Sequence, residues 1–142
     1  MIGTVLCDVT DPLAGRSAAA FAAALGTRLA LRLVLVHVVP GMGSPVRAST
    51  PAEAEQTLDL IACALWPEVE TRVVAGGHAE ALARVADEEG ADLIVVGARP
   101  AGLGRRNLRA TLVRELEAAT AIPVLVAPPT TRRRSGRRLA TR

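Results

Sequence analysis

The chain has 142 residues, half of them apolar and 22% charged, which suits one globular domain whose core needs neither metal ions nor disulfides. It contains one Phe, one Trp and no Tyr, so it lacks the aromatic platforms on which single-stranded nucleic acids stack. All 17 basic residues are arginines, and six of them lie in the last eleven residues. The formal net charge of +3 therefore combines a mildly acidic body with a strongly basic tail.

The amino-terminal residues and the cysteines indicate the compartment. Asp8 and Asp11 stand where a secretory signal would carry cations, and arginines interrupt every apolar stretch before it reaches the length of a membrane span. We therefore expect a cytoplasmic protein that does not enter a membrane. Cys7 and Cys63 lie in apolar segments and form no CxxC pair, so we expect both to be buried as small hydrophobic residues.

Short apolar runs alternate with longer helical segments along the body of the chain. In chain order we expect strand Gly3–Asp8, helix Leu13–Leu25, strand Leu31–Val39, a helix opened by the capping box Thr50–Glu53, strand Val69–Ala75, helix Ala79–Glu89, strand Asp92–Val96, helix Thr111–Thr120 and strand Pro123–Ala127. Gly26 and Gly90 are expected to end the first and third helices. Strands that are apolar on both faces are typical of parallel sheets. The sequence thus predicts an α/β fold, an open parallel sheet with helices on both faces.

The residues also exclude several kinds of nucleotide-binding and catalytic site. A P-loop needs a lysine, which the chain lacks, and no GxGxxG follows the first strand. His37 and His78 each stand without an obvious partner, and no cluster of Cys, His and acids has the spacing of metal ligands. We therefore expect no catalytic residues and no metal site.

The segment after the strand Asp92–Val96 is the most informative for function. An Arg- and Gly-rich loop joins this strand to the helix that we expect near Thr111, and this order builds an anion cradle at the carboxyl end of a parallel strand. Pro100 lies in the loop and offers no backbone N–H to a phosphate. Four guanidinium groups of the same stretch are available to hold an anion instead. They belong to Arg99, Arg105, Arg106 and Arg109.

Four segments together resemble the universal stress protein family over residues 1–128. They are VLCDVTD, LGTRLALRLVLVHVV, GGHAEALARVADEEGADLIVVG (the most specific) and PVLVAP. The resemblance implies a single doubly wound domain whose five parallel strands are ordered 3-2-1-4-5. It also implies a homodimer through the fifth strand, Pro123–Ala127, whose apolar edge favours pairing on physical grounds too. Residues 129–142 form an Arg-rich tail that we expect to be disordered when free.

The ATP-binding branch of this family carries Gly-x2-Gly-x9-Gly-Ser/Thr after the fourth strand. Gly97 and Thr111 match the outer positions of that motif, whereas Pro100 and Ala110 replace its two inner glycines. A lost hydrogen bond to a charged phosphate is worth about 1.5–3 kcal/mol. Ala110 would cost about 1–2 kcal/mol more only if its backbone were left-handed. The site is therefore expected to be weakened.

The resemblance places Asp8 on the ribose side of a bound nucleotide and Val38 against the adenine. The complete set of candidate cofactor-binding residues is Asp8, Val38, Gly97, Arg99, Gly102, Thr111 and Leu112. We expect ATP or AMP to bind there weakly or not at all, because of Pro100 and Ala110.

Three functions stay open on this sequence. The first is a universal stress protein-like binding or signalling protein, not an enzyme, whose adenine-nucleotide site is weakened. The second is a working ATP-binding stress-response switch with at most slow hydrolysis, in which Arg105 and Arg106 replace the motif glycines. The third uses the tail, Arg132–Arg142, as an arm that binds nucleic acid or another acidic partner in a salt-dependent, sequence-blind way.

Overall fold

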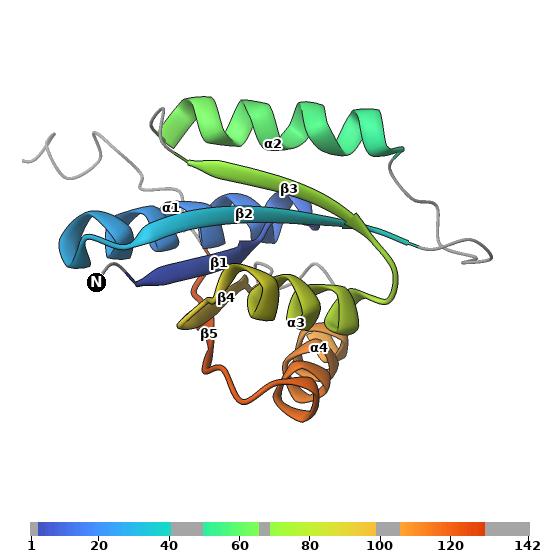
Figure 1. The fold of residues 1–142 in the computed structure, drawn as a ribbon. Coiled ribbons are helices and arrows are strands. Elements are labelled where there is room, and N and C mark those ends of the chain that lie inside the picture. The colour runs from blue at the N-terminus through green and yellow to red at the C-terminus, as the bar shows by residue number, and fades with distance from the viewer. Residues whose placement is uncertain (1–2, 41–49, 66–68, 99–105, 130–142) are drawn as a thin grey trace, which may run out of the picture.

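A computed structural model describes residues 3–40, 50–65, 69–98 and 106–129 of the chain (Figure 1). The loop residues Arg99, Pro100 and Gly102 and the tail beyond Pro129 lie outside the described residues, so the predictions made for them stand as predictions. Within the described residues, nine strands and helices follow one another in strict alternation. They are β1 Thr4–Asp8, α1 Pro12–Leu29, β2 Arg32–Val39, α2 Pro51–Leu65, β3 Glu70–Ala75, α3 His78–Glu89, β4 Leu93–Gly97, α4 Arg106–Ala119 and β5 Val124–Ala127.

The strands form one parallel sheet in the order β3-β2-β1-β4-β5, which confirms the predicted fold class and strand order. The order reverses at β1, whose neighbours are β2 on one side and β4 on the other. Because all strands run the same way, β1, β2 and β4 end at one edge of the sheet, which we call the carboxyl edge. Open α/β sheets bind ligands at this edge, next to the strand where the order reverses.

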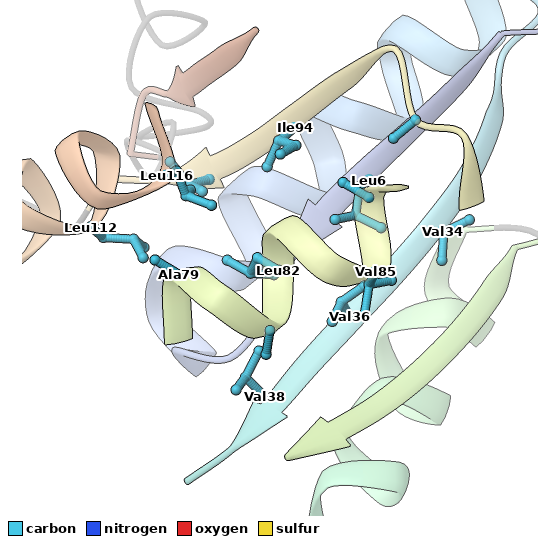
Figure 2. Packing of buried hydrophobic residues seen from close by; sticks show 14 residues of the cluster. Leu6, Val34, Val36, Val38, Ala79, Leu82, Val85, Ile94, Leu112 and Leu116 are labelled. Atoms are coloured by element: carbon cyan, nitrogen blue, oxygen red, sulfur yellow. The ribbon is translucent and has the colours of Figure 1, made fainter. Parts of the chain in front are cut away.

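One face of the sheet packs against α3 and α4. Alternate residues of the central strands meet the apolar side of α3, where Leu82 and Val85 are fully buried, and α4 adds Leu112 and Leu116 (Figure 2). The other alternate residues of these strands face the opposite side of the sheet, in agreement with the prediction of strands that are apolar on both faces. The resulting cluster packs α3 against β1 and β2, and this packing places the start of α3 at the carboxyl edge.

The opposite face packs against α1 and α2. Small alanines of α1 let that helix lie close to the sheet, and Leu58 and Ile61 of α2 complete the cluster. Cys7 is buried in it as predicted, but the prediction for Cys63 is wrong, because its side chain is exposed on α2. Cys63 lies on the side of α2 turned away from Leu58 and Ile61, so its apolar sequence neighbours did not reveal its exposure.

Helix α1 continues beyond its predicted end. It begins as expected, with the carboxylate of Asp11 accepting a hydrogen bond from Leu13 N–H at 3.0 Å. Gly26 does not end it: the helix runs to Leu29, and Ala30 takes the left-handed conformation (φ 54°) that closes it. Gly26 instead supplies the carbonyl that accepts hydrogen bonds from the cap and from Leu31 N–H, the latter at 2.9 Å.

Two other helix ends test the local signals. The capping box at α2 is confirmed: Thr50 N–H donates to Glu53 at 2.8 Å, and Glu53 N–H donates to the Thr50 hydroxyl at 3.2 Å. The predicted start of α4 is wrong, because the helix begins at Arg106 rather than near Thr111. The arginines and leucine between these two positions are good helix formers, so the helix extends toward the loop by more than a turn.

None of the described helices is both long enough and apolar enough to cross a membrane.

A charged network ties three elements together at the other edge of the sheet. Arg32, the first residue of β2, donates from Nε to Glu70 of β3 at 2.5 Å and from Nη2 to the same carboxylate at 3.1 Å. Its Nη2 also pairs with Glu89 at the end of α3, which Arg72 of β3 reaches at 3.1 Å. Paired Arg–carboxylate hydrogen bonds are stronger than single ones, so we expect this network to contribute to stability.

We expect Arg32→Ala to lower the free energy of unfolding by about 1–2 kcal/mol, discounted because the side chain is one-third exposed. Urea denaturation at low and at high ionic strength measures the loss, which should shrink in salt because exposed charges are screened. Arg28→Ala, which removes an exposed arginine near the end of α1, is the control and should change stability by less than about 0.5 kcal/mol. A loss that is equal in both variants, or independent of salt, would contradict this assignment.

Candidate functional site

A buried carboxylate lies at the centre of the carboxyl edge. Asp8 is the last residue of β1, and its side chain is 2% exposed. Its Oδ1 accepts two hydrogen bonds from one residue, from Thr10 N–H at 3.0 Å and from the Thr10 hydroxyl at 2.5 Å. The turn after β1 thus folds back on the strand and holds the carboxylate in one orientation.

The hydroxyl of Thr10 also connects β1 to β2. Its Oγ1 accepts a hydrogen bond from Val38 N–H at 3.0 Å, beyond the point where β1 has ended and can no longer supply a ladder partner. The position that the resemblance places against adenine is therefore linked, through one hydroxyl, to the position that it places on the ribose side. The structure brings the predicted residues Asp8 and Val38 together in this way.

His78 completes the cluster, although the sequence analysis found no partner for it. It is the first residue of α3, and its Nε2 lies 2.9 Å from Asp8 Oδ2. The two residues are 70 positions apart, and only the packing of α3 on the sheet brings them together. The available signal was topological: a histidine that opens a helix after a parallel strand lies at the same edge as an aspartate that ends one.

Two opposing effects set the charge of Asp8. Burial raises its pKa, but the hydrogen bond and positive charge of His78 and the two hydrogen bonds from Thr10 outweigh burial, so the pKa lies below its ordinary value. The carboxylate is therefore ionised throughout the physiological range. Burial together with the charge of Asp8 raises the pKa of the neighbouring Cys7 thiol well above its usual range, so this cysteine is an inert core residue.

His37 is a second buried imidazole, on β2 immediately before Val38. Its Nδ1 has no hydrogen-bond partner among the described residues. Burial lowers the pKa of His37, and the charge of Asp8 opposes this effect without overcoming it. The ring is therefore neutral at pH 7 and becomes costly to protonate in the folded protein.

We expect His37 to make the protein less stable in mild acid. Because the pKa of His37 is lower in the folded protein than in the unfolded chain, the unfolded chain takes up the proton first as the pH falls. The free energy of unfolding is therefore unaffected by His37 above about pH 6.5 and decreases below it. One proton changes the free energy of unfolding by at most about 1.4 kcal/mol per pH unit. Urea denaturation of the wild type and of His37→Gln at about pH 7.5 and 5.5 measures this dependence. An equally steep loss in the variant would assign the effect to other groups.

Gly97, which matches the first motif position, has a packing reason to be glycine. A Cβ at this residue would lie 2.6 Å from the carbonyl carbon of Ala14 in α1 and 3.1 Å from its Cα. Real Cβ atoms do not approach backbone so closely, so α1 can cross β4 here only over a glycine. The match at Gly97 is therefore required by the fold, whether or not a phosphate binds beside it.

The remaining described candidates lie on α4. Thr111 is exposed and stands in the second turn of the helix instead of at its start, while Leu112 is buried in the cluster beneath α3 (Figure 2). Ala110 is helical and does not have a positive φ, so the left-handed strain considered above does not arise. Among the described residues, no group of three or more His, Cys, Asp or Glu side chains is placed to hold a metal ion.

These features define a doubly wound α/β protein with a buried acid at the carboxyl end of its central strand, the class to which the sequence motifs pointed. A sequence model described as the universal stress protein family matches residues 1–128. The chain therefore belongs to the universal stress protein family. A search of curated proteins gave no significant match.

Solved structures of this family share the fold. A universal stress protein family member from Burkholderia pseudomallei is 24% identical, with a TM-score of 0.66 over 89% of this chain and 96% of that one. A universal stress protein in complex with cAMP is 22% identical, with a TM-score of 0.66 over 91% and 98% of the two chains. The universal stress protein from Archaeoglobus fulgidus in complex with dAMP is 20% identical, with a TM-score of 0.64 over 89% and 98%.

Proposed function

We propose that this protein is a nucleotide-binding universal stress protein that acts by binding rather than by turnover, and that its carboxyl edge binds adenine nucleotides weakly. Membership of the family supports the first part, as do the neighbours that bind cAMP and dAMP. The observation that carries the second part is the hydrogen-bond network of Asp8, Thr10, Val38 and His78, which the protein completes without a ligand.

On the base and ribose side, a nucleotide has to compete with this network. An adenine that used Val38 N–H would displace the Thr10 hydroxyl, and a ribose hydroxyl that donated to Asp8 would meet a carboxylate already bound by Thr10 and His78. Exchanging one hydrogen bond for another gives little net free energy. The gain from these contacts is therefore expected to be small.

On the phosphate side, the motif has lost its inner glycines. Pro100 offers no N–H, and the match at Gly97 is explained by packing against Ala14. Because α4 begins at Arg106, Thr111 is displaced from the helix start, where free backbone N–H groups would face an anion. The missing N–H of Pro100 and the displacement of Thr111 favour weak binding of ATP, and Gly97 gives no evidence for tight binding.

Thermal unfolding of a variant truncated after Pro129 tests the proposal, with Mg-ATP, AMP or inorganic phosphate added. Truncation matters because the six tail arginines could attract ATP by themselves. At about 5 mM ATP and a Kd of about 1 mM, the ligand adds about 1 kcal/mol of stability, which corresponds to a few degrees in Tm. We expect shifts of this size with ATP and AMP and smaller shifts with phosphate.

A matched pair of variants identifies the site in this experiment. Asp8→Asn should reduce the nucleotide-dependent shift, whereas Glu80→Gln, which changes an exposed carboxylate on the first turn of α3, should keep it unchanged. Saturation at micromolar ATP would overturn the weak-binding proposal and favour a working switch. The absence of any shift at millimolar ATP would overturn nucleotide binding itself.

We also propose that the protein forms a homodimer through β5. This strand closes the sheet on one side, pairs only with β4 among the described strands, and carries Val126 with 42% of its surface exposed. An apolar edge strand offers unpaired backbone groups to a second copy. Sedimentation should show a dimer for the wild type and a monomer for Val126→Lys; a Val126→Lys dimer of unchanged affinity would contradict this arrangement.

A further inference from the structure

The geometry points to His78 and Asp8 as a proton-linked latch, in which a ribose hydroxyl reaches Asp8 only by displacing the imidazole and protonation of the imidazole holds the latch closed. This inference rests on the proposed binding of nucleosides at the carboxyl edge, and it adds that protonation regulates this binding. It assigns to His78 the role of a positioning residue for the ligand-binding carboxylate.

The first step is that the two oxygens of the Asp8 carboxylate accept hydrogen bonds from different residues. Oδ1 of Asp8 accepts both the N–H and the hydroxyl of Thr10, at 3.0 and 2.5 Å, and these two donors belong to the same turn as the carboxylate. Oδ2 faces His78 Nε2 at 2.9 Å, which comes from a different element. A ligand hydroxyl therefore competes most easily for Oδ2, where the present donor is a side chain that can rotate away.

The second step is accessibility. The side chain of Asp8 is 2% exposed, whereas that of His78 is 35% exposed and connects the buried carboxylate to solvent. Rotation of the imidazole needs no movement of the sheet, because His78 is the first residue of α3 and the next turns of that helix supply the packing. The ligand therefore gains access to Asp8 through a change at one side chain.

The third step is the linkage to protons. A charge-assisted hydrogen bond from an imidazolium to a buried carboxylate is stronger than one from a neutral imidazole, so protonation makes displacement more costly. His78 also lies at the amino end of a helix, where the helix dipole disfavours a cation. Once a ligand has taken Oδ2, the imidazolium of His78 loses its hydrogen bond to the Asp8 carboxylate, and protonation of His78 becomes less favourable. Ligand and proton therefore oppose each other, and by linkage each weakens the other equally.

Among the described residues, other titratable and charged groups lie on the elements next to the pair. On β1, Cys7 is buried as a neutral thiol, and on β2, His37 is the other imidazole, electrostatically coupled to both Asp8 and His78. Asp11 caps α1, and on α3 Glu80 is exposed while Arg84 donates to Ala75 C=O at 3.3 Å. Of these, only His37 has an ordinary pKa in the window where an imidazole titrates, so it is the group that a control must remove.

Adenosine is the appropriate probe, because a phosphate would titrate in the same pH range. We expect the wild-type protein to bind adenosine about tenfold more tightly at about pH 8 than at about pH 5.8, an ordinary coupling between two sites. His78→Gln keeps a side-chain donor for Asp8 but cannot be protonated, and its affinity should change by less than about twofold over the same range. His37→Gln, the matched control, should keep the full pH dependence.

The chain contains only two histidines, so NMR can follow each imidazole separately. Saturating adenosine should lower the pH at which His78 titrates and leave His37 nearly unchanged. If adenosine binds but its affinity is independent of pH in the wild type, or equally pH-dependent in His78→Gln, the latch is overturned while nucleoside binding stands. If neither the wild type nor His78→Gln binds adenosine at about pH 8, the proposed function fails and the latch fails with it.

Discussion

Gly97→Ala is expected to destabilise the protein by about 3 kcal/mol or more, the upper end of the range for overpacking a core. The added Cβ would lie 2.6 Å from the carbonyl carbon of Ala14. Backbone atoms cannot move away by a rotamer change, as the end of a flexible side chain can. The clash is removed only if α1 moves away from β4, and this movement would separate α1 from the buried residues that it packs against. Urea denaturation followed by circular dichroism measures the loss.

Gly77→Ala is the matched control for this experiment. A Cβ at Gly77 would find only atoms of Glu80, at 3.8 Å and beyond, and the residue has φ −63°, which alanine adopts without strain. We therefore expect a change of less than about 1 kcal/mol there. Equal stability of Gly97→Ala and the wild type would show that α1 can shift freely, and Gly97 would then need an explanation in ligand binding instead of packing.

The regular part of the fold follows from local patterns in the sequence. Apolar runs of strand length, the capping box Thr50–Glu53 and the helix-ending Gly90 each correspond to the structure, since each depends on neighbouring residues alone. The errors occur at helix ends, where more than one residue can begin or end the helix. Gly26 lies inside α1 because its carbonyl receives the capping hydrogen bonds while Ala30 accepts the left-handed turn, and α4 extends back to Arg106 because no helix-breaking residue follows Gly104.

The site was predictable as a location but not as a network. Asp8 and Val38 end neighbouring parallel strands, so the sequence places both at the carboxyl edge. The role of His78 depends on the packing of α3 against β1, which no short-range pattern encodes, and the sequence analysis therefore missed it. The double hydrogen bonding of Thr10 was missed for the same reason, because its hydroxyl bridges two strands that are far apart in the sequence.

Asp8→Ala is expected to lower the free energy of unfolding by about 3 kcal/mol, the lower end of the range for breaking a buried charged pair. The variant leaves two donors of Thr10 and the imidazole of His78 without their acceptor, and it weakens the link from Thr10 to Val38. We expect a loss of free energy of unfolding no larger than this, because His78 is partly exposed and can form hydrogen bonds with water in the variant. Chemical denaturation at about pH 7 measures the difference from the wild type.

The pH dependence of that difference identifies its origin. The pKa of Asp8 is lowered in the folded protein, because His78 and Thr10 outweigh the effect of burial. The carboxylate therefore contributes fully to the free energy of unfolding above its unfolded pKa of about 3.9. This contribution is lost as the pH falls through the folded pKa. The gap between Asp8→Ala and the wild type should therefore narrow below about pH 4. Asp11→Ala is the control, since it removes a carboxylate of the same turn whose role is to cap α1, and it should cost only about 1 kcal/mol. An Asp8→Ala loss no larger than that of Asp11→Ala, or one that persists undiminished in acid, would mean that the carboxylate network does not stabilise the carboxyl edge.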